Sequence, residues 1–178
     1  VRLIQCIDKR GERRVGRVEN TQVRQLANVA SMYELAVRAI EQGKSLEQIA
    51  STASGAGEEP YAEILQSGRI RPPLTHPDPA HCLVSGTGLT HLRSAAARDA
   101  MHKKVARSEA ELTDSMRLFK LGIEGGRPEA GSVGVQPEWF YKGDGSMLVD
   151  PGAPLARPAF ALDGGEEPEL VGLYVIGP

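Results

Sequence analysis

Apolar and polar residues alternate over short stretches at the start of the chain, which predicts β-strands. The run VRLIQCI (1–7) is followed by the charged turn DKRGERR and then by VGRVEN (15–20). Two such runs joined by a glycine-containing turn are typical of a β-hairpin, here placed around Gly11. We therefore expect residues 1–27 to form short strands.

A helical pattern replaces this alternation after residue 30. Ser31 and Glu34 have the spacing of a capping box, and the apolar residues that follow recur at helical intervals as far as Gly43, a typical stop. Ser45 and Gln48 repeat the start signal directly afterwards. The pattern predicts one helix from residue 31 and a second, shorter one.

Glycine and proline mark the next boundaries. We expect SGAGEE (54–59) to be a flexible break and PYAEILQSG (60–68) to be a third short helix. The segment RPPLTHPDPAH (71–81) is rich in proline, which fixes φ and removes the backbone N–H, so it is expected to be extended. It is the candidate boundary between two domains.

The second half of the chain predicts a different mixture of elements. HCLVSGTGLTH (81–91) is typical of a buried strand that runs into a glycine turn, and the alanine-rich stretch 92–106 is typical of a helix. Helical spacing continues over 108–123, whereas 135–158 indicates strands and tight turns. The final run, 163–178, predicts one more strand. These elements indicate an α+β protein whose second half is dominated by β structure.

Composition narrows the possible partners and location. The 178 residues carry a net charge of −2, so no basic surplus favours nucleic acid or an anionic membrane. The longest apolar run is too short to cross a bilayer, and the charge order of the first residues is the reverse of a secretory signal. Cys6 and Cys82 are expected to be buried free thiols in a reducing compartment. We therefore expect a cytoplasmic protein.

Carboxylates gather in front of the last apolar run. On a strand, residues two apart share a face, so Glu167 and Glu169 are expected to point the same way. Two carboxylates about 5 Å apart repel by roughly 3 kcal/mol at an effective dielectric constant of 20. A hard divalent cation such as Mg²⁺ reverses the sign of this interaction. By itself the pattern is also typical of a solvated acidic turn.

Three segments together resemble the fumarylacetoacetate hydrolase superfamily: GTGLTH (86–91), QPEWFYKGDGSMLVDPG (136–152) and EPELVGLYVIG (167–177). In that superfamily a Pro-x-x-Phe-x-Lys segment precedes a Glu-x-Glu strand that ends in Ile-Gly. The segment WFYKGDG and the glycine turn in GTGLTH are most similar to a sugar-acid branch of the superfamily. This branch resembles the 2-keto-3-deoxy-pentonate (arabinonate or xylonate) dehydratases.

The resemblance implies a fold and a division into domains. Residues 1–75 would form a small N-terminal domain of strands and short helices. Residues 76–178 would form the first portion of a mixed β-roll, with a helical lid segment at about 92–126. The third metal carboxylate of the superfamily and much of its β-roll lie past residue 178. We therefore expect this chain to be part of a longer protein and, taken alone, to bind metal weakly and to show no turnover.

The resemblance also implies an Mg²⁺-dependent lyase and its site residues, with Mn²⁺ or Ca²⁺ as alternative metals. The substrate would be a 2-keto-3-deoxy sugar acid, the product a keto semialdehyde, and the protein a homodimer. Either a histidine or a lysine would serve as the base that takes the C3 proton. The site residues are His91 and Lys142 for catalysis, Glu167 and Glu169 for the metal, and Thr90 and Ser146 for the substrate.

One departure from the family pattern bears on the reaction. The hydrolases of the superfamily pair the histidine of this turn with a glutamate three residues on, and that position is Ser94 here. A dehydratase does not need the activated water that such a pair provides. A C–C bond hydrolase or decarboxylase of acylpyruvate-type substrates stays an alternative, as does a non-catalytic sugar-acid-binding protein.

Overall fold

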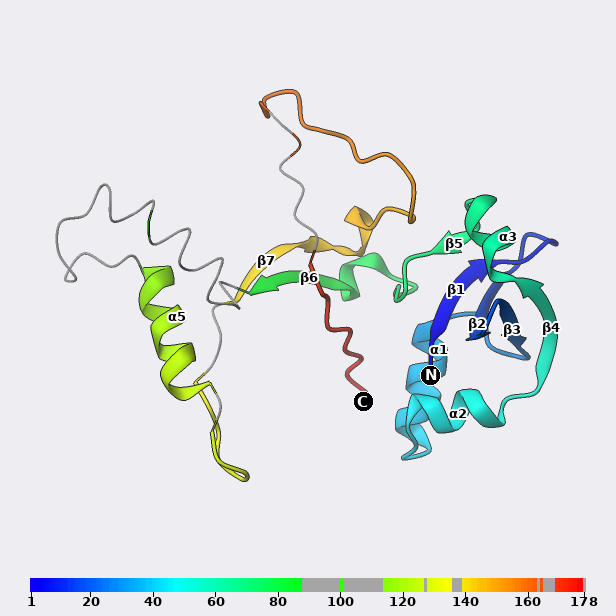
Figure 1. Cartoon of the computed structure of the whole chain (residues 1–178), viewed down its shortest axis with the longest axis horizontal. Helices are drawn as coiled ribbons and strands as arrows, with labels where there is room; N and C mark the ends of the chain where they lie inside the picture. Colours follow the sequence, from blue (N-terminus) through cyan, green and yellow to red (C-terminus); the bar gives the residue numbers. More distant parts are fainter. Residues whose placement is uncertain are drawn as a thin grey trace. The chain divides into compact units, whose positions relative to one another are not determined.

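The computed structural model describes residues 1–87, 100, 114–126, 128–135, 139–162, 164 and 169–177. The chain divides into two compact units (Figure 1). The N-terminal unit comprises Val1–Cys82 with Gly145–Pro178, and the central unit comprises Leu83–Asp144. The boundary expected near residue 75 stays a prediction.

An antiparallel five-stranded sheet forms the centre of the N-terminal unit, with the strand order β4-β3-β2-β1-β5 (Figure 1). The strands are β1 (Leu3–Ile7), β2 (Arg13–Glu19), β3 (Gln22–Leu26), β4 (Gly55–Pro60) and β5 (Ile70–Arg71). The first three confirm the prediction of short strands over residues 1–27. Together with the helices, they also confirm the α+β class.

The turn between β1 and β2 is held by a single carboxylate. Asp8 Oδ1 accepts hydrogen bonds from the backbone N–H groups of Arg10 and Glu12, at 2.8 and 2.9 Å. Gly11 has a φ of +84°, a conformation that glycine adopts without steric cost. The hairpin predicted around Gly11 is therefore confirmed.

The three helices predicted for this unit are all present. They are α1 (Met32–Glu41), α2 (Leu46–Thr52) and α3 (Tyr61–Gln66). Ser31 Oγ accepts the N–H of Glu34, and Ser45 and Gln48 form a reciprocal capping box. Such a cap replaced by alanine typically costs about 1 kcal/mol. These contacts are local, which is why the sequence alone predicts them.

The helices cover both faces of the sheet. One cluster packs α1 and α2 against Val15 and Leu26 of the sheet, with Leu35 fully buried in it. A second, smaller cluster packs Ile64 of α3 against Cys6 and the neighbouring valines of β2 and β3. The sheet is therefore the middle layer of this unit, and each face is closed by helices.

The segment expected to be a flexible break is instead a strand. β4 pairs antiparallel with β3, with Val23 opposite Glu59 and Gln22 opposite Pro60. Its composition of glycine and glutamate is unfavourable for a strand. The neighbouring strand supplies the hydrogen bonds, and proline lies at the end of this edge strand, where it is tolerated. The prediction of a break was wrong because pairing overrides local propensity.

Among its described residues, the central unit contains a two-stranded antiparallel sheet and the helix α5. The strands are β6 (Leu83–Thr87) and β7 (Trp139–Asp144), and the helix is α5 (Asp114–Gly125). β6 confirms the strand predicted before the glycine turn, but Leu83 is 66% exposed, so the expectation that it is buried was wrong. α5 confirms the later part of the helix predicted over 108–123. Of the predicted helix 92–106, only residue 100 lies within the described residues.

The strand predicted at the end of the chain is not formed in the part that the structure describes. Residues 169–177 have no regular secondary structure, and Leu170 and Ile176 are 104% and 94% exposed. A β-strand needs a neighbour for its backbone groups, and no strand pairs with this segment among the described residues. In the described residues after 81, the strands β6 and β7 are accompanied by the longer helix α5, so β structure does not dominate there, contrary to the expectation.

Within the described ranges, no helix is long and apolar enough to cross a membrane. Cys6 and Cys82 are both free thiols, as predicted, but only Cys6 is buried and Cys82 is half-buried.

Candidate functional site

Two segments that carry the family resemblance lie next to each other in the central unit. β6 ends in the first residues of GTGLTH, and β7 is the segment WFYKGD. The two strands pair antiparallel, with Gly86 opposite Phe140 and Thr87 opposite Trp139. The sequence alone does not predict that these strands are neighbours, because more than fifty residues separate them. Their pairing is a product of the tertiary structure.

Lys142 lies at an irregularity in this pairing. Tyr141 is opposite Ser85 and Gly143 is opposite Val84, so Lys142 is an extra residue on β7, a β-bulge. Its side chain is exposed, and its Nζ lies 5.6 Å from the centroid of the Phe140 ring. This separation is within the range of a cation–π interaction.

The other described candidate residues lie outside regular strands. Ser146 is an exposed residue of the 3₁₀ turn η3 (Gly145–Met147), which follows β7 directly. Gly145 is closely packed there, since a Cβ added to it would meet Cys82 Cβ at 2.9 Å. Glu169 is exposed in the segment without regular structure. The described residues therefore show Lys142 in a defined strand environment.

Three of the predicted site residues, Thr90, His91 and Glu167, lie outside the described residues. Within the described residues, no group of three or more His, Cys, Asp or Glu side chains is arranged to hold a metal ion. Of the two predicted metal ligands, Glu169 alone is among the described residues. The Mg²⁺ site therefore stays a prediction.

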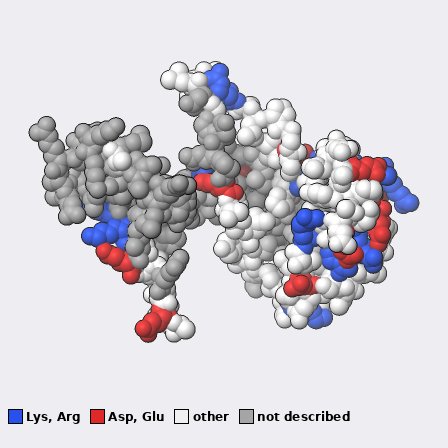
Figure 2. Space-filling view, in the orientation of Figure 1, with Lys and Arg blue, Asp and Glu red and all other residues white. Residues whose placement is uncertain are grey.

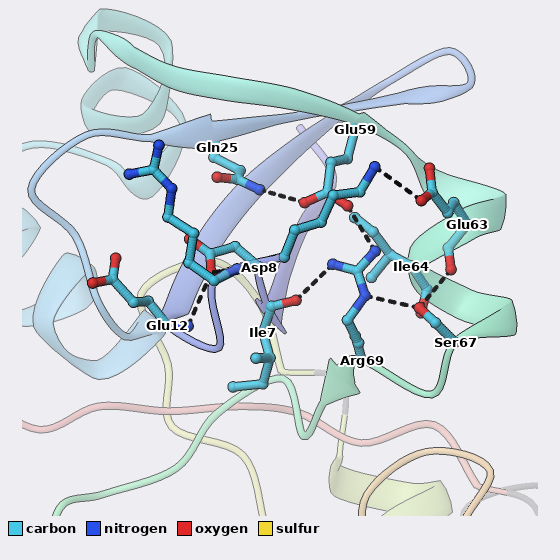
Figure 3. Close-up of polar contacts among 11 residues, drawn as sticks. Ile7, Asp8, Glu12, Gln25, Glu59, Glu63, Ile64, Ser67 and Arg69 are labelled. Atoms are coloured by element: carbon cyan, nitrogen blue, oxygen red, sulfur yellow. Dashed lines mark hydrogen bonds and ion pairs between the residues drawn. The ribbon is translucent and has the colours of Figure 1, made fainter.

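A polar network in the N-terminal unit was not predicted from the sequence (Figure 3). Glu59 of β4 accepts a hydrogen bond from Gln25 Nε2 at 2.9 Å and pairs with Arg69 Nη2 at 2.6 Å. Arg69 also donates to the carbonyl oxygen of Ile7 and to Ser67 Oγ. The hydrogen bond to Glu59 raises the pKa of the Arg69 guanidinium above its usual range.

A second carboxylate, Asp8, lies at the edge of the same network (Figure 3). The hydrogen bond from the N–H of Glu12, with those from Arg10 and Arg14, holds the pKa of Asp8 below its usual range. Nearby, burial together with the carboxylate of Glu59 raises the pKa of the Cys6 thiol to about 11. A thiol held in this neutral form is a poor nucleophile, so Cys6 has a packing role.

A polar cleft of about 190 Å³ opens beside this network. Its lining residues are Asp8, Lys9, Arg10, Arg14, Gln25, Ala56, Gly57, Glu58 and Glu59. The three carboxylates among them pair with arginines: Asp8 with Arg14, Glu58 with Arg24, and Glu59 with Arg69.

Acidic and basic side chains also lie close together on the surface of the N-terminal unit. On the face drawn in Figure 2, acidic and basic side chains are interspersed rather than gathered by sign. Charges that neutralise one another across neighbouring strands stabilise the sheet, and we interpret the network as structural. The sequence signal for it was weak, because Glu59 and Arg69 become neighbours only when β4 forms.

Comparison of the chain with protein-family models, curated proteins and solved structures finds no match. The pairing of β6 with β7 and the surroundings of Lys142 are therefore the structural observations that bear on function.

Proposed function

We propose that this chain contributes active-site residues to an Mg²⁺-dependent dehydratase of 2-keto-3-deoxy sugar acids, in the sugar-acid branch of the fumarylacetoacetate hydrolase superfamily that it resembles. The observation that carries the proposal is the antiparallel pairing of β6 with β7. It brings the start of GTGLTH beside WFYKGD, as expected if both segments serve one site. A homodimer in the cytoplasm is part of the same proposal.

The proposed reaction removes one water from the substrate. A base takes a proton from C3, and an acid protonates the C4 hydroxyl, which leaves as water. The product of this elimination has a double bond between C3 and C4. Removal of a proton from C5 and protonation of C3 convert it to the enol of the C5 aldehyde, which tautomerises to the keto semialdehyde, so that substrate equals product plus water. His91 and Lys142 are the candidates for these two roles, and Thr90 and Ser146 for contacts with the substrate.

Lys142 has a second possible task, because an ammonium group pairs readily with a substrate carboxylate. Its exposure on β7 is consistent with either task. Glu167 and Glu169 would hold the metal, together with a ligand from elsewhere in the protein. When bound, Mg²⁺ would act as a Lewis acid on the keto acid and increase the acidity of the C3 protons.

The absence of a glutamate three residues after His91 favours dehydration over hydrolysis. Ser94 occupies that position, and a serine does not provide the carboxylate that would orient the histidine as a base toward water. Cleavage of a C–C bond in an acylpyruvate is the alternative on the same fold, and it predicts different products.

The test uses the full-length gene product with Mg²⁺ and a panel of 2-keto-3-deoxy pentonates and acylpyruvates, with products read by mass spectrometry. We expect a pentonate to lose 18 mass units and the Glu169→Gln variant to lose this activity. Glu129→Gln, the same chemical change at an exposed loop residue, is the matched control and should keep it.

Other outcomes contradict the proposal in distinguishable ways. Release of pyruvate or CO₂ would replace dehydration by C–C cleavage. Binding of a keto acid without turnover by the unaltered protein would indicate a non-catalytic binding protein. Equal activity of the Glu169→Gln and Glu129→Gln variants would remove Glu169 from the site.

A further inference from the structure

The surroundings of Lys142 contain two features that the family resemblance does not assign. The first is the β-bulge, in which Lys142 is the extra residue of β7. A bulge bends the strand and changes the direction of a side chain, and bulges are frequent beside active sites for this reason.

The second feature is the tight space between the two strands at Gly86. A Cβ added to Gly86 would lie 2.6 Å from Phe140 Cζ and 2.7 Å from Lys142 Cε. Both distances are shorter than any normal carbon–carbon contact. The lysine stem and the phenylalanine ring therefore occupy the volume that a side chain at position 86 would fill.

Phe140 and Lys142 are two residues apart on β7 and reach the same position on β6. The Lys142 Nζ lies 5.6 Å from the Phe140 ring centroid. An aromatic face attracts an ammonium group. The ring is therefore one of the groups that restrict where the ammonium group lies.

We propose that Gly86 and Phe140 are positioning residues for Lys142. Gly86 provides the space through which the lysine stem passes, and the Phe140 ring holds the ammonium group. The inference rests on the proposed function for the role of Lys142 in the reaction. The arrangement itself is independent of that role and can be tested without substrate.

The first measurement is the NMR shift of ¹³C-dimethylated lysines in the full chain. The Lys142 resonance is assigned by its loss in Lys142→Arg. We expect a ring-current shift away from the position of exposed lysines, which disappears in Phe140→Leu and is retained in Phe140→Tyr. Tyr141→Leu, which removes a neighbouring exposed ring from the same strand, is the control and should leave the shift unchanged.

Gly86 is tested by adding one methyl group. Gly86→Ala should move the Lys142 resonance, because the new Cβ displaces the lysine stem or the ring. Gly122→Ala is the matched control in the same unit, since a Cβ at Gly122 meets no atom within 4 Å. Circular dichroism of each variant establishes that the fold is retained.

Turnover provides the second readout once a substrate is known. Phe140→Leu should lower kcat/KM about two- to fivefold, the range of an exposed cation–π contact. Phe140→Tyr should restore it. Gly86→Ala should lower it about 100-fold, as expected for a misplacement of about 1 Å.

A Lys142 resonance at the exposed-lysine position in the unaltered protein, or one unaffected by Phe140→Leu, would overturn the inference whatever the reaction. A shift that behaves as expected, in a protein that does not dehydrate sugar acids, would keep the positioning and reject only the proposed function.

Discussion

Replacing Glu59 by alanine is expected to destabilise the N-terminal unit far more than the same replacement of its neighbour Glu58. The two glutamates are adjacent on β4, and each pairs with an arginine. The Glu59–Arg69 pair is largely buried, with side chains 8% and 17% exposed, at an N–O distance of 2.6 Å. The Glu58–Arg24 pair is open to solvent, with side chains 51% and 44% exposed, at 2.8 Å.

The two distances are similar, so burial decides the difference. Removing one partner of a buried ion pair leaves an uncompensated charge and costs about 3–5 kcal/mol. Glu59→Ala also removes the acceptor for Gln25 Nε2. Because Arg69 keeps hydrogen bonds to Ile7 and Ser67, we expect a loss of about 3–4 kcal/mol. An exposed pair contributes about 0.2–1 kcal/mol, which is the loss expected for Glu58→Ala.

The assay is urea unfolding followed by circular dichroism, with a double-mutant cycle of Glu59→Ala and Arg69→Met. Each single variant should lose stability because it leaves one charge of the buried pair without its partner. The loss in the double variant should be smaller than the sum of the two single losses, because no unpaired charge is left. Equal losses for Glu58→Ala and Glu59→Ala, within about 0.5 kcal/mol, would refute the reasoning. So would additive effects of Glu59→Ala and Arg69→Met.

Two further predictions concern titrating groups. Because the pKa of Asp8 is lowered in the folded chain, the stability that it provides is present above its unfolded pKa, near 4, and is lost as the pH falls through the folded value. The stability difference between the unaltered chain and Asp8→Asn should therefore shrink between pH 6 and pH 3 in urea titrations, and a constant difference would contradict this. Because the pKa of Cys6 is raised to about 11 and its side chain is buried, Ellman's reagent at pH 8 should react first with the half-buried Cys82. Loss of the fast phase in Cys6→Ser instead of Cys82→Ser would show the assignment to be wrong.

The elements that could be predicted are those whose signals lie within a few residues. Ser31 and Ser45 each cap the helix that follows them through contacts three residues away. The turn at Gly11 depends on Asp8 and on a left-handed backbone that glycine favours. Such interactions need no residue from a distant part of the chain, so the local sequence is sufficient to predict them.

The elements that were predicted wrongly depend on contacts between distant parts of the chain. β4 was missed because its glycines and glutamates oppose strand formation, and the pairing with β3 overrides this. The final apolar run was predicted as a strand from its composition, yet within residues 169–177 no partner strand is present. In both cases a β-strand depends on a neighbour that the local sequence does not specify.

In the candidate site, too, the sequence determined some features and the tertiary structure determined others. Lys142, Glu169 and the other candidate residues came from the family resemblance, which depends on the order of motifs along the chain. Only the tertiary structure placed Phe140 opposite Gly86, made Lys142 the extra residue of a bulge, and joined Glu59 to Arg69. Those contacts join segments far apart in the sequence, and they form only when strand pairing and burial bring the segments together.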